Sequence, residues 1–396
     1  MLSKRLIVIL LFFLCCGNGS DSNTVKLDSL NEENLKNSTV FNNILTLQMS
    51  FGDYGLKDEF LLAIPEAILV DNNDNMLVYD EKRMKVFNSE GKEVTIFGKP
   101  GIGPGEFGAM RMASSVYMSE SGYITQLCNR IFNVFKPDYS WLETKNFLLS
   151  DLYATIKKMQ GYDSCSLHAI YALDDKKRLL KGVGGKGKGD SRDSYDFLAF
   201  YNGESTVVID EYKRIDKTKN RRARVAGVAS FVWEELLDSR VIYSYSGKDT
   251  ERNENGIYYI LNMYDINRNE YSKIMHRYIP VEISSEVIDR ISSIYIGEEE
   301  QKEVKKILKK FKYRPALRSL LADGNYLFAF TYLKNSKDEI YVDVFDTKTM
   351  KYLHSAYFPF IPRLIKNGFA YRINRPQKEF ATVEKYKGDD IVYGVK

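Results

Sequence analysis

The chain has 396 residues, of which 28% are charged, and its formal net charge at pH 7 is +4. This length is enough for one large domain or two ordinary ones, and the charged fraction is too high for a membrane channel. A nucleic-acid binder usually carries a larger basic excess, so we expect no nucleic-acid partner. The 28 Tyr and 22 Phe residues favour many short strands over a helical bundle.

Residues 1–15 are typical of an export signal. Lys4 and Arg5 form a short basic region, and the apolar run Leu6–Leu14 is shorter than the roughly 20 residues that span a bilayer. Cys16 follows at once, which resembles bacterial lipoproteins, where this thiol is lipidated and becomes the first mature residue. The resemblance implies a lipid anchor at Cys16, a polar tether over residues 16–24 and a place at the outer membrane or cell surface. Cleavage by an ordinary signal peptidase is the alternative.

Residues 25–396 are predicted to form one strand-rich domain. It opens with a clear strand at Ile44–Met49, after a polar lead-in. Ring-shaped folds often use such a leading strand to complete their last sheet, which removes an open edge. We therefore expect Ile44–Met49 to close the ring.

Two successive stretches, 64–107 and 108–139, repeat one pattern of short β runs separated by turn residues. Arg83 of the first stretch recurs as Arg130 of the second, and Asn75 recurs as Gly122 at the same spacing. Four short β runs per copy indicate the blades of a β-propeller.

The two copies are joined by the glycine- and proline-rich segment Phe97–Phe107. Glycines permit a positive φ and prolines fix φ, so this segment is predicted to be a rigid irregular connector. Its sequence resembles the inter-blade signature of NHL-repeat propellers, and the preceding residues Asp80, Arg83 and Phe87 match that repeat too. Together with the leader, the chain is similar to the NHL-like or TolB-like propeller lipoproteins of Gram-negative bacteria. The resemblance implies an all-β fold with six blades.

The rest of the chain is strand-rich but divergent, with room for four more blades. The third blade is predicted at Leu167–Leu173, Leu179–Val183, Phe197–Tyr201 and Thr206–Ile209, and the fourth at Val225–Trp233, Val241–Ser246, Ile257–Asp265 and Tyr271–His276. The fifth is predicted at Leu317–Asp323, Tyr326–Tyr332, Ile340–Asp346 and Tyr352–Phe358, and the last at Leu364–Phe369, Ala370–Asn374, Phe380–Lys385 and Ile391–Tyr393.

A helical hairpin at about residues 284–311 interrupts the strands before the fifth blade. Val304, Ile307, Leu308 and Phe311 recur with helical spacing, while lysines occupy the other face. The run of glutamates that starts at Glu298 suits the positive end of a helix dipole. We expect the apolar face to pack on the ring.

Two cysteines, Cys128 and Cys165, follow the leader. In an oxidising compartment they could pair if their Cα atoms lay within roughly 7 Å. Two buried free thiols are the favoured reading.

No catalytic residue, metal site or cofactor is predicted. His168, His276 and His354 fall one at a time in separate units, without the spacing of metal ligands, although a propeller could gather them at its axis. The loop Gly182–Ser194 imitates a phosphate-binding loop, but Gly189 stands where Ser or Thr should hold magnesium. A mobile hairpin tip is the preferred interpretation.

The basic run Lys217–Arg224 is best explained as a solvated loop, with an anionic glycan or lipid surface as a minor alternative. Taken together, these features predict a non-catalytic binding or scaffold propeller at the cell envelope, with an unknown peptide, glycan or protein as partner. The alternative is an envelope enzyme, a lyase or hydrolase acting on sugars or peptides. That alternative predicts a cluster of carboxylates or histidines in the propeller funnel.

Overall fold

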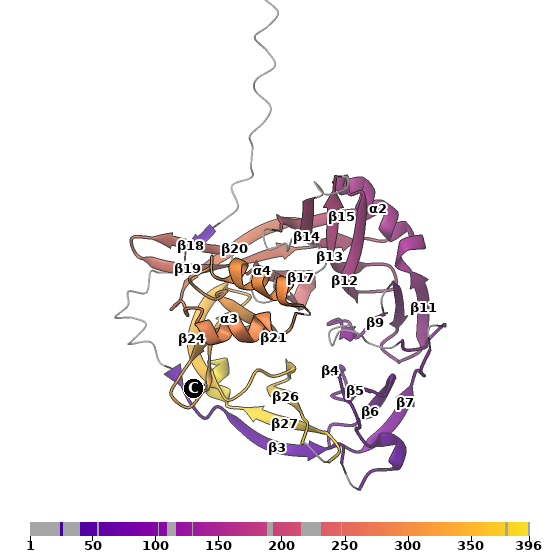
Figure 1. Cartoon of the computed structure of the whole chain (residues 1–396). Helices are drawn as coiled ribbons and strands as arrows, with labels where there is room; N and C mark the ends of the chain where they lie inside the picture. Colours follow the sequence, from indigo (N-terminus) through magenta and orange to yellow (C-terminus); the bar gives the residue numbers. More distant parts are fainter. Residues whose placement is uncertain are drawn as a thin grey trace, which may run out of the picture.

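The computed structural model describes residues 24–26, 40–53, 55–101, 103–108, 116–128, 130–187, 193–214, 231–246, 248–295, 297–376 and 379–394. Six antiparallel sheets stand around a common axis, as Figure 1 shows. Each blade has four strands that run up and down, with the first strand nearest the axis, and the sheets of blades four and five carry further strands. The chain therefore forms a β-propeller, as the repeat predicts, with the six blades that the family resemblance implies.

The first three blades follow the chain without interruption. Blade one contains β4 (Ala67–Val70), β5 (Met76–Asp80), β6 (Arg83–Phe87) and β7 (Glu93–Phe97), and blade two contains β8 (Val116–Met118), β9 (Ile124–Cys128), β10 (Ile131–Phe135) and β11 (Trp141–Asn146). Blade three contains β12 (Ser164–Ala172), β13 (Arg178–Lys186), β14 (Asp193–Tyr201) and β15 (Thr206–Lys213).

The last three blades are extended by strands from elsewhere. Blade four contains β16 (Phe231–Leu236), β17 (Arg240–Tyr245), β19 (Gly256–Asp265) and β20 (Glu270–Arg277), with β18 (Thr250–Asn253) paired to β19. Blade five contains β21 (Leu317–Asp323), β22 (Tyr326–Lys334), β23 (Ile340–Asp346) and β24 (Lys351–Phe358), and blade six contains β25 (Leu364–Lys366), β26 (Phe369–Asn374) and β27 (Thr382–Gly388).

Three short strands from the N-terminal part of the chain lie at the outer edges of three consecutive blades. β1 (Thr24–Lys26) pairs with β20 of blade four, and β2 (Val40–Phe41) pairs with β24 of blade five, both in parallel. β3 (Leu45–Phe51) then becomes the fourth strand of blade six by pairing antiparallel with β27. This confirms that the leading strand closes the ring.

The prediction of the last strand of blade six is wrong. Ile391–Tyr393, predicted as the last strand, belongs to a 3-10 helix, η5 (Asp390–Tyr393). The outer edge of β27 is already occupied by β3, so no pairing position remains for the C-terminal residues, and they pack Val392 into the core instead. The other 3-10 helices are η1 (Asp58–Phe60), η2 (Phe147–Leu149) and η4 (Leu237–Ser239).

The predicted helical hairpin is confirmed as α3 (Ser285–Ser292) and α4 (Glu298–Leu308). Its buried residues Ile288, Val304 and Leu308 share a core cluster with blades three and four, including residues of β17, and Figure 1 shows both helices in orange. A further helix, α2 (Asp151–Gln160), was not anticipated. Ser150 and Gly161 cap it, so a start and a stop signal were present in the sequence.

The hydrophobic core is divided among the junctions between neighbouring blades. The connector Phe97–Phe107 shows how one junction is made, because Phe107 is fully buried and stacks on Phe135 of the next blade at 5.2 Å. Gly98 is needed for this approach, since it has φ +73° and an added Cβ would lie 1.9 Å from the Phe107 ring. The prediction of a rigid connector agrees with this packing.

A buried ion pair holds the chain that leads from the closing strand to blade one. The Lys85 ammonium lies 2.7 Å from the Asp80 carboxylate, and both side chains are 0% exposed. Lys85 also donates to the Leu61 carbonyl, and Asp80 accepts from the backbone amides of Ala63 and Ile64. The pair therefore fixes the 61–64 segment where the ring closes.

Replacing Lys85 with Met is expected to lower the free energy of unfolding by about 3–5 kcal/mol, because Asp80 would stay buried without a countercharge. Denaturant unfolding measures the effect. The exposed pair Lys57–Glu93 provides the control, and Lys57→Met should change stability by less than about 1 kcal/mol. If both substitutions cost the same, the ion pair does not hold the closure. The double variant with Lys85→Met and Asp80→Asn should regain part of the loss.

Candidate functional site

The fold brings six turns together at one end of the axis. In every blade the first two strands are antiparallel neighbours and the first strand is innermost, so the turn between them lies beside the axis at the same end. The first turn of blade two carries Glu120, and Lys366 is the last residue of the innermost strand of blade six, just before its first turn. The end of the innermost strand of blade four carries Glu234 and Glu235. We call these four residues, with Tyr117, Tyr171 and Trp233, the axial cluster.

Glu120 links three blades that are not neighbours in the ring. Its carboxylate lies 2.7 Å from the Lys366 ammonium of blade six, and its backbone amide donates to the Glu235 carboxylate of blade four at 3.3 Å. Blades two, four and six therefore meet across the axis through side chains.

The same turn of blade two contacts its two direct neighbours. The Ser121 hydroxyl donates to the Leu173 carbonyl of blade three at 2.5 Å, and the Asn72 amide of blade one donates to the Glu120 carbonyl at 3.4 Å. The position of Glu120 is thus set by several blades at once.

Three aromatic side chains form a continuous row beside these charges. Tyr117 stacks on Tyr171 with ring centroids 4.4 Å apart, and Tyr171 meets the Trp233 ring edge to face at 4.6 Å. They come from β8, β12 and β16, the innermost strands of blades two, three and four. All three rings, and Glu234, keep partial exposure, so solvent reaches this part of the axis.

The carboxyl groups of the cluster are perturbed by their surroundings. Burial, reinforced by repulsion from Glu120, raises the pKa of Glu235 to about 8 and raises the pKa of Glu234 well above its ordinary value. Lys366 opposes both shifts. Burial also raises the pKa of the Tyr171 hydroxyl, and negative charge on Glu234 contributes to that shift. Glu235 can therefore be protonated near neutral pH, and a cation placed beside Glu234 and Glu235 would favour the ionised form of both.

The predicted histidines are not brought together. His168 lies in blade three, His276 in blade four and His354 in blade five, and the last two are buried. The His354 imidazole contacts the Val392 carbonyl at 2.8 Å, and burial lowers its pKa. Within the described ranges, no group of three His, Cys, Asp or Glu side chains is arranged to hold a metal ion.

A serine, a histidine and an aspartate do meet in the core between blades four and five, but not as a nucleophile site. The Ser355 hydroxyl donates to Asp343, and His276 lies 3.6 Å from the same carboxylate. Ser355 is 0% exposed and Tyr259 donates to the other Asp343 oxygen. The group is a buried hydrogen-bond network that joins two blades.

Among the remaining sequence features, the structure describes the two cysteines and part of the glycine-rich loop, but not the other predicted sites. Cys128 and Cys165 are both buried and form no disulfide with each other, as favoured, and burial raises the pKa of the Cys165 thiol to about 12. Gly182–Lys186 of the glycine-rich loop continue strand β13, so the predicted hairpin tip is shorter than expected. Cys16, the predicted lipid anchor, and the basic run Lys217–Arg224 lie outside the described residues.

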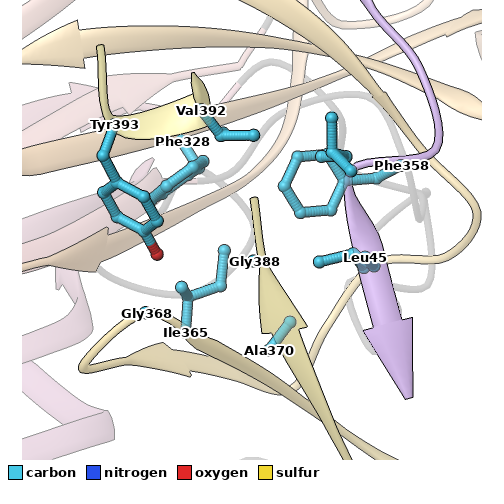
Figure 2. Close-up of a pocket in the computed structure, with 10 residues that line it drawn as sticks. Leu45, Phe328, Phe358, Ile365, Gly368, Ala370, Gly388, Val392 and Tyr393 are labelled. Atoms are coloured by element: carbon cyan, nitrogen blue, oxygen red, sulfur yellow. The ribbon is translucent and has the colours of Figure 1, made fainter. Parts of the chain in front are cut away.

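A small apolar cavity lies between blades five and six, and Figure 2 shows its lining. Phe328, Phe358, Ile365 and Val392 contribute carbon atoms, and the Tyr393 hydroxyl donates to Asp323 at 2.8 Å. Such a lining is that of a packing defect in the core rather than a ligand site.

The residues of the axial cluster were not predicted from the sequence. Glu120 and Lys366 are 246 positions apart, and they face each other only because their turns reach the same axis. The sequence did contain one signal for them. A charged residue in or next to the first turn of a blade is expected to lie near the axis of the ring. That signal becomes usable once the blade boundaries are known.

No family model matches this sequence, and no curated protein matches it. Among solved structures, a candidate exported protein from Bacteroides fragilis has a TM-score of 0.43 at 14% identity, covering 88% of this chain and 99% of that one. The WD40 domain of Pan2 from Neurospora crassa has a TM-score of 0.38 at 10% identity, covering 92% and 97%. A protein of unknown function from Bacteroides caccae has a TM-score of 0.28 at 7% identity, covering 70% and 90%. All three scores are below 0.5, so none informs the function of this chain.

The described part of the chain contains no helix with the length and apolar character that crossing a bilayer requires.

Glu235→Gln is expected to stabilise the protein at alkaline pH. Above the ordinary Glu pKa of 4.5 the folded state holds a proton that the unfolded state releases, so this group's contribution to stability falls as pH rises toward about 8. The glutamine variant has no such proton. Its melting temperature should therefore exceed that of the wild type by a difference that grows from pH 5 to pH 8, on the order of 2–5 °C.

Thermal melts across this pH range measure the difference. The exposed Glu254, in blade four as well, gives the control, and Glu254→Gln should follow the wild type at every pH. A constant difference between Glu235→Gln and wild type would contradict the raised pKa.

Proposed function

We propose that this protein is a binding propeller of the cell envelope, NHL-like or TolB-like, tethered by a lipid on Cys16, whose axial cluster holds a ligand with an ammonium group. An amino sugar and a lysine side chain both carry that group. The sequence supports export and anchoring through the basic region, the apolar run and the cysteine that follows it.

The observation that carries this proposal is the pairing of acids with an aromatic row. Glu120, Glu234 and Glu235 face one lysine, Lys366, so the cluster has an excess of negative charge whenever Glu234 and Glu235 are ionised. Aromatic faces attract cations, and Trp233 is the strongest type of aromatic partner. An ammonium group would satisfy both features, because it pairs with the carboxylates and rests against a ring.

The test uses tryptophan fluorescence. The chain has two Trp residues, and Trp141→Phe would leave Trp233 as the single reporter. The capped tripeptide Ala-Lys-Ala and a glucosamine oligomer are the probes, each matched by its N-acetylated form, which lacks the charge. We expect saturable binding of at least one charged probe, at least 10-fold weaker binding of its acetylated form, and a similar loss in Glu234→Gln.

The pH dependence gives a second readout. Affinity for the lysine peptide should rise from pH 6 to pH 9, because Glu235 ionises at about 8 while the lysine stays charged. Glu254→Gln is the control that should bind like the wild type. Equal affinity for the charged and acetylated probes, or an affinity that Glu234→Gln leaves unchanged, would rule out the ammonium site.

One observation favours a second candidate, an envelope enzyme acting on sugars or peptides. A carboxyl group with a pKa near neutrality, such as that of Glu235, is suited to act as a general acid. The enzyme hypothesis also predicts carboxylates in the funnel. Turnover of an oligosaccharide or peptide that disappears in Glu235→Gln while binding persists would select this function over binding alone.

Lipid anchoring has its own test, built on two adjacent cysteines. Cys16→Ser is expected to abolish incorporation of a labelled fatty acid and to move the protein from the membrane fraction to the soluble fraction of cells. Cys15→Ser should leave both unchanged, because Cys15 precedes the first mature residue. Labelling that survives Cys16→Ser would place the lipid on another residue and contradict anchoring through Cys16.

A further inference from the structure

A second cluster of charge lies at the other end of the ring, where the chain passes from blade four to blade five. The segment after α4 forms a β-bridge between Tyr313 and Glu282, and the Arg314 amide donates to the Val281 carbonyl at 2.8 Å. These contacts fix the two residues between the β18 hairpin of blade four and the first two strands of blade five. The axial cluster is at the opposite end, because connections between blades and first turns lie at different ends of up-and-down sheets.

Each of two tyrosine rings in this region carries two cations. Arg314 and Arg318 lie 5.0 and 5.9 Å from the centroid of the Tyr332 ring. Lys312 and Arg252 lie 5.1 and 6.0 Å from the centroid of the Tyr313 ring. Tyrosine faces hold the guanidinium planes in place without neutralising them. We call these four cations and two rings the cationic patch.

The patch is poorly compensated by acids. Lys312 pairs with Glu282 at 3.4 Å, whereas Arg252, Arg314 and Arg318 have no carboxylate at ion-pair distance among the residues that the structure describes. Burial and the positive charges of Arg290 and Arg318 lower the pKa of the Arg314 guanidinium. The patch therefore holds like charges together against their mutual repulsion.

We propose that the cationic patch binds a compact soluble ligand bearing a phosphate group, such as a sugar phosphate. A phosphate carries up to two negative charges and presents several acceptor oxygens, which suits two guanidinium groups, Arg314 and Arg318, that lie over one tyrosine ring. It would replace the repulsion among the arginines with charge-assisted hydrogen bonds.

Burial favours a compact ligand over a lipid surface. Arg252 and Arg318 are exposed, but Arg314, Tyr313 and Tyr332 are only partly exposed. A flat bilayer could reach the outer cations but not Arg314, whereas a small anion can reach Arg314 together with Arg318, which lies on the same ring. The predicted occupant is therefore a soluble phosphate compound rather than a phospholipid headgroup.

The experiment compares the binding of inorganic phosphate and of a hexose 6-phosphate by calorimetry at low salt. The double variant Arg314→Gln with Arg318→Gln should bind the hexose phosphate at least 10-fold more weakly than wild type. Arg268, an exposed arginine of blade four beyond the patch, gives the matched control, and Arg268→Gln should bind normally. Arg314→Lys keeps the positive charge but removes the planar guanidinium group. We expect this variant to fold and to bind the hexose phosphate with an affinity between those of the wild type and the double variant.

Vesicles containing phosphatidylglycerol form the other arm, with neutral phosphatidylcholine vesicles as blank. Binding to the anionic vesicles without binding to the soluble phosphates would replace the proposed ligand with a lipid and overturn the proposal. Absence of saturable binding at millimolar phosphate, or binding unchanged in the double variant, would overturn it as well. A melting temperature of the double variant at or above that of wild type shows that its loss of binding is not a loss of folding.

Discussion

The pairing of β3 with β27 is the interaction on which the rest of the structure depends. It joins residues 45–51 to residues 383–388, near the two ends of the chain, and so converts an open series of sheets into a closed ring. The Lys85–Asp80 pair then anchors the segment that leaves β3 for blade one. A closed ring gives every blade two neighbours, and only then do the innermost strands hold their side chains in fixed places around one axis.

Closure also explains why charge is tolerated near the axis. Glu120 and Lys366 come from blades that are not adjacent, and each is held by a turn whose backbone cannot retreat without breaking contacts to a neighbouring blade. The raised pKa of Glu235 is a consequence of the same confinement, because burial beside Glu120 penalises the ionised form. Such groups weaken the ring at alkaline pH, a cost that a binding role for the site would account for.

The two ends of the propeller differ in character. One end gathers carboxylates with Tyr117, Tyr171 and Trp233, and the other gathers Arg252, Arg314 and Arg318 with two tyrosines. Both combine aromatic rings with charge of mainly one sign, which is an unfavourable arrangement in an empty site. The two surfaces would therefore attract ligands of opposite charge.

The sequence by itself determined the architecture. The repeated short β runs of residues 64–139, the connector Phe97–Phe107 and the helical spacing after Glu298 all depend on local periodicity and on the φ preferences of Gly and Pro, which neighbouring residues reveal. Tertiary structure decided the site and the last strand. Ile391–Tyr393 has strand-like composition but becomes η5 because β3 holds the edge, and Glu120 faces Lys366 because ring geometry, not sequence separation, sets their distance.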